Sequence, residues 1–191
     1  YEANMQLLRE MGVELIPFSP IHDTEIPAAD GVLFYGGYPE LFAKELSENE
    51  KMRQDVKEKL AEGLPCMAEC GGFMYLHQTM EDMEGNSWPM AGIIDGTAYR
   101  TKKLGRFGYI ELERAEDAKE GCRLKGHEFH YFDSTSCGES YLAKKPLSSR
   151  SWRCIHETET LMAGFPHLYY YASPEFILKF LKKCRKYQET K

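Results

Sequence analysis

The sequence has no segment of the kind that crosses a membrane or directs a protein into one. None of its apolar runs approaches the roughly 20 residues that span a bilayer, and its start lacks the basic residues and apolar stretch of a signal peptide. A basic stripe is lacking too, because the net charge is −6 and the lysines and arginines are scattered among acidic residues. Such a surface does not grip phosphate backbones. We therefore expect a cytoplasmic protein that binds neither membranes nor nucleic acid.

Cysteine pairs that bind zinc and loops that bind nucleotide phosphates are also absent from the sequence. No two of its six cysteines form a C-x-x-C pair, so no metal site is predicted; they are Cys66, Cys70, Cys122, Cys137, Cys154 and Cys184. No G-x-x-x-x-G-K-[ST] loop occurs. The 191 residues are 42% hydrophobic, enough to bury a core without disulfides. We expect a single domain with reduced thiols.

The first half of the chain alternates helical and strand patterns. Helices are predicted over 2–11, 47–62 and 71–79, and strands over 13–18, 31–35 and 64–68. The second helix has a capping box, Ser47 with Glu50, and Gly63 ends it. Strands separated by helices indicate an α/β fold whose central sheet is mostly parallel and has helices on both faces.

The second half is rich in strand-forming residues. Short segments with β-branched and aromatic side chains, separated by turn residues, predict strands over 92–101, 107–114, 126–133, 140–145 and 151–157. A last helix begins at Ser173-Pro174-Glu175, which offers a cap, a proline at the first helical position and an acid in the first turn. The two halves are interpreted as one α/β unit.

Cys70 lies in the segment GLPCMAECGGFMYL, between a buried strand and a helix. A nucleophile on such a tight turn needs small residues around it, and Ala68 and Gly72 provide them. The first amides of the helix would then face the sulfur, favour its thiolate and donate to an oxyanion. The alternative is a packed thiol, since cysteine is among the most buried residue types. Cys66, inside the strand, is expected in the core.

A second glycine turn, Gly36-Gly37, also follows a predicted strand. Its amides could form the other half of an oxyanion hole at the carboxyl edge of a parallel sheet, or the turn could be a plain connection. A cysteine nucleophile also needs a base. His127 and His130, in GHEFH, are one residue short of the spacing of a helical zinc motif, whereas His167 lies just after a turn and before the final helix. A lone histidine there serves either structure or catalysis.

These segments together resemble the C-terminal glutaminase domain of the cobyrinic acid a,c-diamide synthase family. The resemblance covers nearly the whole chain and rests on GLPCMAECGGFMYL, GHEFHYF, GFPHLYYYASPEF and the region around FYGGYPELF. It implies a class I glutamine amidotransferase-like, flavodoxin-like fold. It also implies that Cys70 attacks the side-chain amide of glutamine and that His167 carries the proton to ammonia. The amides of Gly37 and Gly71, beside Gly36, would stabilise the oxyanion.

The resemblance further implies partners outside this chain. A synthetase domain of the same enzyme would activate the a and c carboxylates of a corrinoid acceptor with ATP and Mg²⁺ in cobalamin biosynthesis, whereas the glutaminase domain needs no cofactor. Residues 1–191 would then be the amidotransferase domain, and the synthetase domain and a first strand would precede Tyr1. The sequence pattern does not decide whether the chain forms a homodimer. It also leaves open other acceptors, as in cobyric acid synthase, another tetrapyrrole amidase or a lipid II amidase, and a non-catalytic assembly role.

Two positions depart from the pattern of related glutaminases. Many class I enzymes have a glutamate two residues after the histidine to orient it, but this chain has Tyr169. Either a Cys-His dyad or a different orienting group must therefore serve; Glu69 and Glu128 are the candidates for that group, and the sequence does not rank them. Family members usually have three glycines where this chain has Tyr35-Gly36-Gly37.

Overall fold

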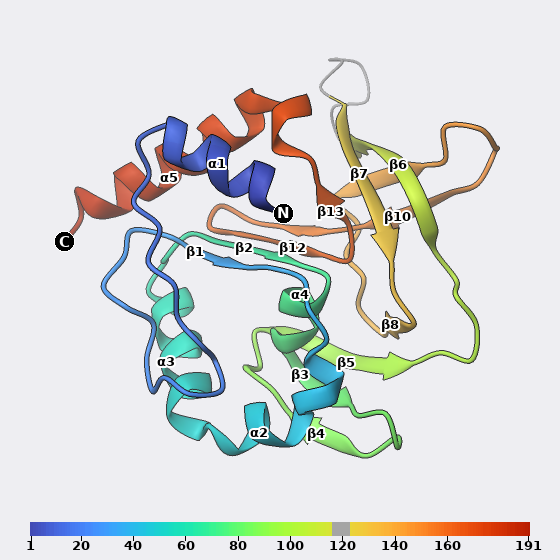
Figure 1. Ribbon diagram of the computed structural model, residues 1–191, viewed down its shortest axis with the longest axis horizontal. Helices are drawn as coiled ribbons and strands as arrows, with labels where there is room; N and C mark the ends of the chain where they lie inside the picture. The colour runs from blue at the N-terminus through green and yellow to red at the C-terminus, as the bar shows by residue number, and fades with distance from the viewer. Residues whose placement is uncertain (116–122) are drawn as a thin grey trace.

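A small central sheet organises the molecule (Figure 1). The computed structural model describes residues 1–115 and 123–191. In the order β1–β2–β12–β11, the central sheet contains β1 Val32–Phe34, β2 Cys66–Glu69, β12 Leu161–Gly164 and β11 His156–Glu157. The first three strands are parallel, and only β11 runs antiparallel to its neighbour. The predicted parallel sheet is therefore confirmed.

Helices cover both faces of this sheet, as predicted (Figure 1). One face carries α1 Glu2–Glu10 and α5 Pro174–Gln188, and the other carries α3 Glu50–Ala61 and α4 Gly71–Tyr75. The alternation of side chains along β2 divides the core in two. Cys66 and Ala68 pack in the core with α3 and α4, and Met67 packs in the core with α1 and α5. The described residues also form the short helices η1 Pro39–Phe42, α2 Ala43–Glu48 and η2 Tyr170–Ala172.

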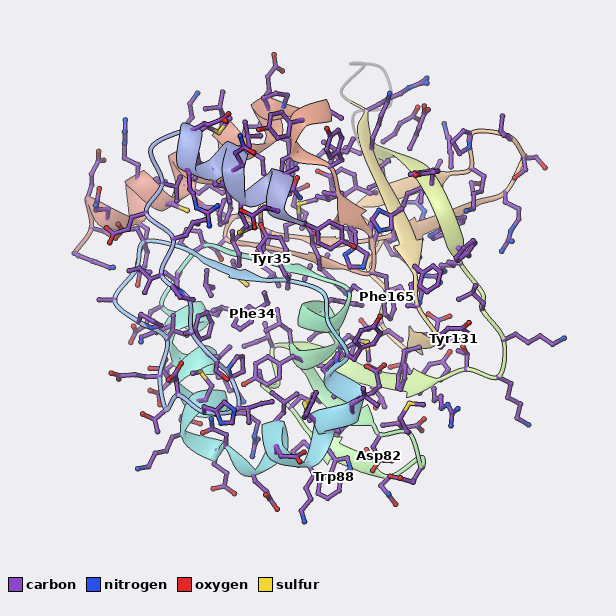
Figure 2. All side chains as sticks on the ribbon, viewed as in Figure 1. Phe34, Tyr35, Asp82, Trp88, Tyr131 and Phe165 are labelled. Carbon is purple, nitrogen blue, oxygen red and sulfur yellow. The ribbon has the colours of Figure 1, made fainter. Side chains whose placement is uncertain are left out.

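The strand-rich second half forms two further sheets. The larger one, in the order β10–β9–β6–β7–β13, is antiparallel and contains β10 Ser151–Cys154, β9 Tyr141–Lys144, β6 Phe107–Arg114, β7 Leu124–Phe129 and β13 His167–Leu168. The smaller one, β4–β3–β5–β8, contains β4 Ser87–Pro89, β3 His77–Glu81, β5 Ile94–Arg100 and β8 Phe132–Ser134. Asp82 closes the β3–β4 hairpin by accepting hydrogen bonds from Trp88 and Asn86 (Figure 2).

The strand predicted over 13–18 is wrong. The segment alternates in burial as a strand does, but it makes no ladder hydrogen bonds. Pro17 has no N–H to donate to a neighbour, and β1, at the edge of the central sheet, is only three residues long. The segment therefore crosses the surface as an extended loop.

The helix predicted over 47–62 is in fact two helices. Asn49 separates α2 from α3, and its side chain accepts a hydrogen bond from the amide of Met52, so Asn49 caps α3 in place of Ser47. The same side chain donates to the carbonyls of Pro20 and Asp23 in the preceding loop. Long-range bonds to that loop thus decide where the helix begins. Its end at Gly63, which has φ +94°, is as predicted.

The helix predicted over 71–79 ends early, at Tyr75. From His77 the chain pairs with β5 as strand β3. The fully buried His77 ring contacts the carbonyl of Phe73 through Nδ1 and the hydroxyl of Ser134 through Nε2, at 2.9 and 2.6 Å. A partner strand and a buried hydrogen-bond network therefore override the local helical pattern. Strand β12 was not predicted from the sequence.

Two further expectations concern the redox state of the cysteines and membrane-spanning helices. The five cysteines that the structure describes are free thiols, and Cys122 lies outside the described residues. Within residues 1–115 and 123–191, no helix is both long and apolar enough to span a bilayer.

Candidate active site

Cys70 occupies the sharp turn between β2 and α4, as predicted. Its backbone has φ 50° and ψ −106°, a left-handed conformation that is strained for a residue with a side chain. The turn is held on both sides, because the Cys70 amide donates to the carbonyl of Gly164 and the Cys70 carbonyl accepts from the amide of Met74. Gly72 lets the turn close, since any Cβ there would overlap the Phe34 carbonyl. The fold therefore fixes the Cys70 side chain at the carboxyl end of a parallel strand.

The protonation state of Cys70 differs from the sequence expectation. The pKa of this thiol is raised to about 12, chiefly by burial and to a smaller extent by the neighbouring carboxyl groups of Glu40, Glu128 and Glu69. A hydrogen bond from the Gly71 amide lowers the pKa, but by less than burial raises it. The resting form near pH 7 is therefore the thiol, because Cys70 is buried and its pKa lies far above neutral. A base must remove the proton when substrate is bound.

The turn at Gly36-Gly37 contacts both sides of the candidate site. A Cβ on Gly36 would overlap Cε1 of His167, so the imidazole ring lies directly against this glycine. A Cβ on Gly71 would lie 2.9 Å from the amide nitrogen of Gly37, which places the two glycine backbones in close contact. The structure therefore places His167 and Gly71, the residue after Cys70, in contact with the same glycine turn.

His167 is held in β13 by its neighbours in the antiparallel sheet. It pairs with His127 of β7, and the two imidazole rings stack with centroids 4.9 Å apart. The Tyr1 ring stacks nearby at 5.0 Å. Burial, followed by the charges of His127 and His130, lowers the pKa of His167 to about 4. The ring is consequently neutral near pH 7 and able to accept a proton.

The structure ranks the two glutamates that the sequence could not. Glu69 Oε2 lies 3.9 Å from Nδ1 of His167. Glu128 instead contacts Nε2 of His130 at 2.7 Å and accepts a hydrogen bond from Trp152 Nε1. Tyr169, at the usual glutamate position, is 53% exposed. The carboxyl group at His167 is therefore supplied by the residue directly before Cys70.

Two supporting residues were missed from the sequence. Asn4 in α1 is buried, and its side chain donates to the Leu168 carbonyl and accepts from the Tyr170 amide, at 2.8 and 3.1 Å. It precedes Leu7 and Leu8 by three and four residues, so helical spacing alone could have placed it on the buried stripe. His127 was considered only as half of a zinc motif. Among the described residues, no cluster of histidine, cysteine and acidic side chains is arranged to hold a metal ion.

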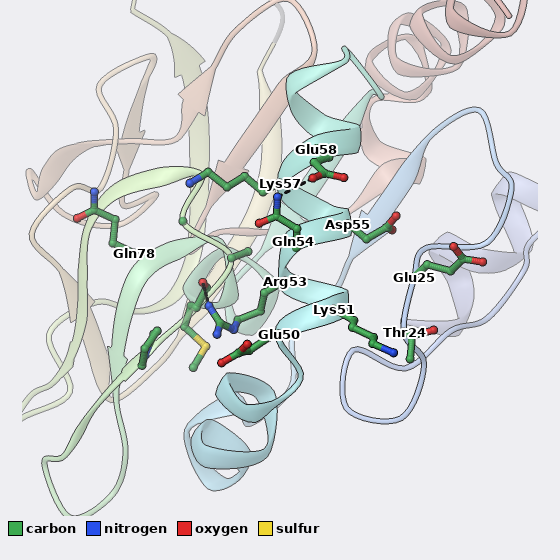
Figure 3. Close-up of a pocket in the computed structure, with 14 residues that line it drawn as sticks. Thr24, Glu25, Glu50, Lys51, Arg53, Gln54, Asp55, Lys57, Glu58 and Gln78 are labelled. Atoms are coloured by element: carbon green, nitrogen blue, oxygen red, sulfur yellow. Dashed lines mark hydrogen bonds between the residues drawn. The ribbon is translucent and has the colours of Figure 1, made fainter.

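A hollow in the described part of the chain lies away from the candidate site. It has a volume of about 760 Å³ and runs between α3 and the segments around β3 and β4 (Figure 3). None of the candidate site residues lines it. Its Arg53 donates to the carbonyls of Ser47 and Met90, and its Asp55 accepts from the Ile26 amide. Arg53 and Asp55 thus hold neighbouring loops in place at this groove.

Comparison with solved structures identifies the class of fold. A crystal structure described as that of a glutamine amidotransferase superposes with a TM-score of 0.66, covering 96% of this chain and 93% of that one at 15% identity. The fold is therefore that of a glutamine amidotransferase, as predicted.

Sequence comparison identifies the family. A model described as the CobB/CobQ-like glutamine amidotransferase domain matches residues 1–173. The chain is 43% identical to cobyrinate a,c-diamide synthase of Caldanaerobacter subterraneus over 190 residues, which is 96% of this chain and 42% of that protein. It is 38% identical to the enzyme of the same name from Listeria innocua, covering 94% and 41%. The chain thus belongs to the CobB/CobQ-like glutamine amidotransferase domain family and spans about two fifths of the length of these curated relatives.

Proposed function

We propose that this chain hydrolyses glutamine through Cys70 and supplies the ammonia for amidation of the a and c carboxylates of cobyrinic acid. The observation that carries the proposal is the strained backbone of Cys70 at the β2–α4 turn, with His167 packed against the neighbouring glycine turn. Backbone strain persists at functional sites where the surroundings enforce it. Among the described non-glycine residues, only Cys70 and Ile155 have a positive φ, and of the two only Cys70 has a nucleophilic side chain.

The proposed reaction has two halves. Cys70 Sγ attacks the side-chain amide carbon of glutamine while its proton passes to His167, which gives that proton to the departing nitrogen to release ammonia. A γ-glutamyl thioester remains. Water then attacks the thioester, His167 takes the proton of the water, and glutamate leaves as the thiol is restored. The amides of Gly37 and Gly71 are the proposed donors to the oxyanion in both halves.

The acceptor and the ATP chemistry belong to the rest of the enzyme in this proposal. Curated relatives that are 36–43% identical share the name cobyrinate a,c-diamide synthase, and the chain spans about two fifths of their length. We propose that the remaining part binds ATP, Mg²⁺ and the corrinoid, and that the enzyme works in the cytoplasm. This chain's own residues bind glutamine and release ammonia.

Replacement of Cys70 tests the nucleophile. In Cys70→Ala, glutamine hydrolysis should be lost, and an electrophilic glutamine analogue should label Cys70 alone in the parent chain, as read by peptide mass spectrometry. Cys184→Ala, which removes a partly exposed thiol of α5, is the matched control and should keep its activity. Labelling at Cys66, or hydrolysis by the Cys70→Ala chain, would contradict the assignment of Cys70 as the nucleophile.

Replacement of His167 tests the base. His167→Asn should slow thioester formation by about 10²–10⁴-fold, the range typical of a positioned general base. Single-turnover measurement of ammonia release separates this step from thioester hydrolysis. A rate within a few-fold of the parent chain would mean that another group takes the proton.

A further inference from the structure

The proposed base has one ring nitrogen with nothing bound to it. Nδ1 of His167 is buried and has no hydrogen-bond partner among the described residues. A buried nitrogen without a partner is unfavourable, so such a group in a site calls for an explanation. The carboxyl oxygen Oε2 of Glu69 lies 3.9 Å from Nδ1, beyond hydrogen-bond range but within the reach of a small ring movement.

Glu69 is itself held in place by two donors. Its side chain is buried, and it accepts hydrogen bonds from the backbone amide of Leu168 at 3.3 Å and from the hydroxyl of Tyr170 at 3.1 Å. The hydroxyls of Tyr170 and Tyr35 are 3.0 Å apart, so Tyr35 can donate in turn (Figure 2 labels Tyr35). Donors aimed at a carboxyl group stabilise its ionised form. The carboxyl group is thus fixed in orientation beside the unpartnered nitrogen.

We propose that Glu69 is the positioning residue of His167, an inference that rests on the function proposed above. In the reacting state, Nδ1–H donates to Glu69 Oε2, and Nε2 is left to accept the thiol proton of Cys70. As that proton arrives, the Glu69 carboxylate compensates the charge of the imidazolium. Hydrogen bonds of catalytic groups are often long before substrate binds and shorten afterwards, which accounts for the 3.9 Å separation.

The electrostatic surroundings explain why such a counter-charge is needed. His167 lies among His127 and His130, and burial disfavours its charged form. Without a nearby anion, protonation of the ring during the reaction would be strongly unfavourable. Among the described residues, Glu69 is the acidic side chain found within 4 Å of a His167 ring nitrogen, whereas Glu128 is occupied by His130 and Trp152.

Burial also raises the pKa of Glu69 to about 8, more than its hydrogen-bond donors lower it. The titratable side chains that face this carboxyl are those of His167, Tyr170, Tyr35, Cys70 and Tyr1. The ionised fraction of Glu69 therefore grows as the pH rises toward 8. If the carboxylate form positions His167, thioester formation should rise about tenfold per pH unit below this value and level off above it.

The test is Glu69→Gln in the 191-residue chain, assayed for glutamine hydrolysis and single-turnover thioester formation. Glutamine keeps the size of the side chain and its acceptor oxygen, but it cannot carry the charge. We expect kcat to fall by about 10²–10⁴-fold, as for other replacements of a carboxylate that orients a catalytic histidine. KM should stay within about threefold, and the rise in rate toward pH 8 should disappear.

Three variants make the result interpretable. Asp82→Asn is the control, a buried carboxyl that accepts hydrogen bonds from Asn86 and Trp88 in the β3–β4 hairpin, and should keep both kcat and the pH profile. Tyr170→Phe removes one donor to Glu69 while keeping the ring, and should move the rise in rate to higher pH. An unmoved rise in Tyr170→Phe, or Glu69→Gln activity within threefold of the parent chain, overturns this inference. Hydrolysis that survives Cys70→Ala overturns the proposed function instead.

Discussion

At the scale of single residues, Gly36 decides where the proposed base can sit. The His167 ring occupies the space that a side chain at position 36 would need, with Nδ1 3.2 Å from the Cβ that this residue lacks. A glycine is needed here because of close approach, since its backbone does not lie in the left-handed region. The same contact links the glycine turn after β1 to the histidine of β13, which are 131 residues apart in the sequence.

Gly36→Ala should therefore displace the His167 ring and lower glutaminase kcat by about 10²-fold or more, because misplacement of a catalytic group by about 1 Å has an effect of this size. Steady-state kinetics at saturating glutamine measure the change. Gly105→Ala is the control, because a Cβ at Gly105 meets no atom within 4 Å and its φ is not left-handed. A Gly36→Ala chain with unchanged kcat would contradict the close packing of the imidazole against this turn.

At the scale of secondary-structure elements, α1 is connected to the site through Asn4. The Asn4 side chain donates to the carbonyl of Leu168, in the two-residue strand β13, and accepts from the amide of Tyr170, at the start of η2. The neighbouring Leu168 amide and Tyr170 hydroxyl are the groups that hold Glu69. Helix α1 thus braces the segment on which the proposed positioning residue depends.

Asn4→Ala should lower the free energy of unfolding by about 2–3 kcal/mol, because it leaves a buried carbonyl and a buried amide without partners. Urea unfolding followed by circular dichroism gives this quantity. Gln6→Ala, on the exposed side of the same helix, is the control and should change stability by less than about 0.5 kcal/mol. Equal effects of the two substitutions would mean that Asn4 contributes only helix propensity.

His77, at the junction of α4 with β3, makes the free energy of unfolding depend on pH. Burial lowers the pKa of His77 to about 4. The pKa of a histidine in the unfolded chain is near 6.5. Between pH 6.5 and pH 4 the unfolded chain therefore binds more protons than the folded chain, so the free energy of unfolding falls as the pH is lowered across this interval. His167 adds to the same loss, because its pKa is lowered in the same direction.

His77→Gln should reduce the loss of stability between pH 6.5 and pH 4, because glutamine does not titrate but can still bond to Ser134. Urea titration at several pH values measures the free energy of unfolding of both chains. The difference between the parent chain and His77→Gln at pH 7.5 is the baseline. The parent chain should lose more free energy than the variant over this interval, by up to about 3 kcal/mol. Parallel curves would show that His77 is not the group responsible.

At the scale of the whole molecule, the chain combines the proposed glutamine site with a sequence that has no P-loop motif. It spans about two fifths of its curated relatives, and no P-loop motif occurs in its sequence. We therefore expect the 191-residue chain to produce glutamate and ammonia from glutamine at a rate that ATP does not change. With ATP, Mg²⁺ and cobyrinic acid added, it should form no amidated corrinoid.

Mass spectrometry of the corrinoid after incubation with amide-¹⁵N glutamine measures amide transfer directly. As a positive control, a full-length relative such as the Caldanaerobacter enzyme, assayed in parallel, should incorporate the label. Amidation by the 191-residue chain alone would refute the division of labour between this domain and the rest of the enzyme.

Several features of the site follow from short segments of the sequence, because local backbone chemistry determines them. An apolar strand that runs into Glu69-Cys70-Gly71 can only turn sharply if small residues flank the cysteine, and the structure has this turn. The glycine turn after β1, the position of His167 after a turn, and the left-handed end of α3 at Gly63 have the same local origin. Each involves residues that are close together in the chain.

Tertiary structure decided the features that depend on residues far apart in the sequence. Glu69 and Leu168 are 99 residues apart, and Asn4 and Leu168 are 164 apart, so no local pattern could reveal that they meet. The protonation states of Cys70 and His167 depend on burial, which only the packed molecule defines. The sequence by itself therefore determined which residues could perform the chemistry, whereas the packing of distant segments decided which carboxyl group faces His167, because that contact exists only when β2 and β13 are brought together.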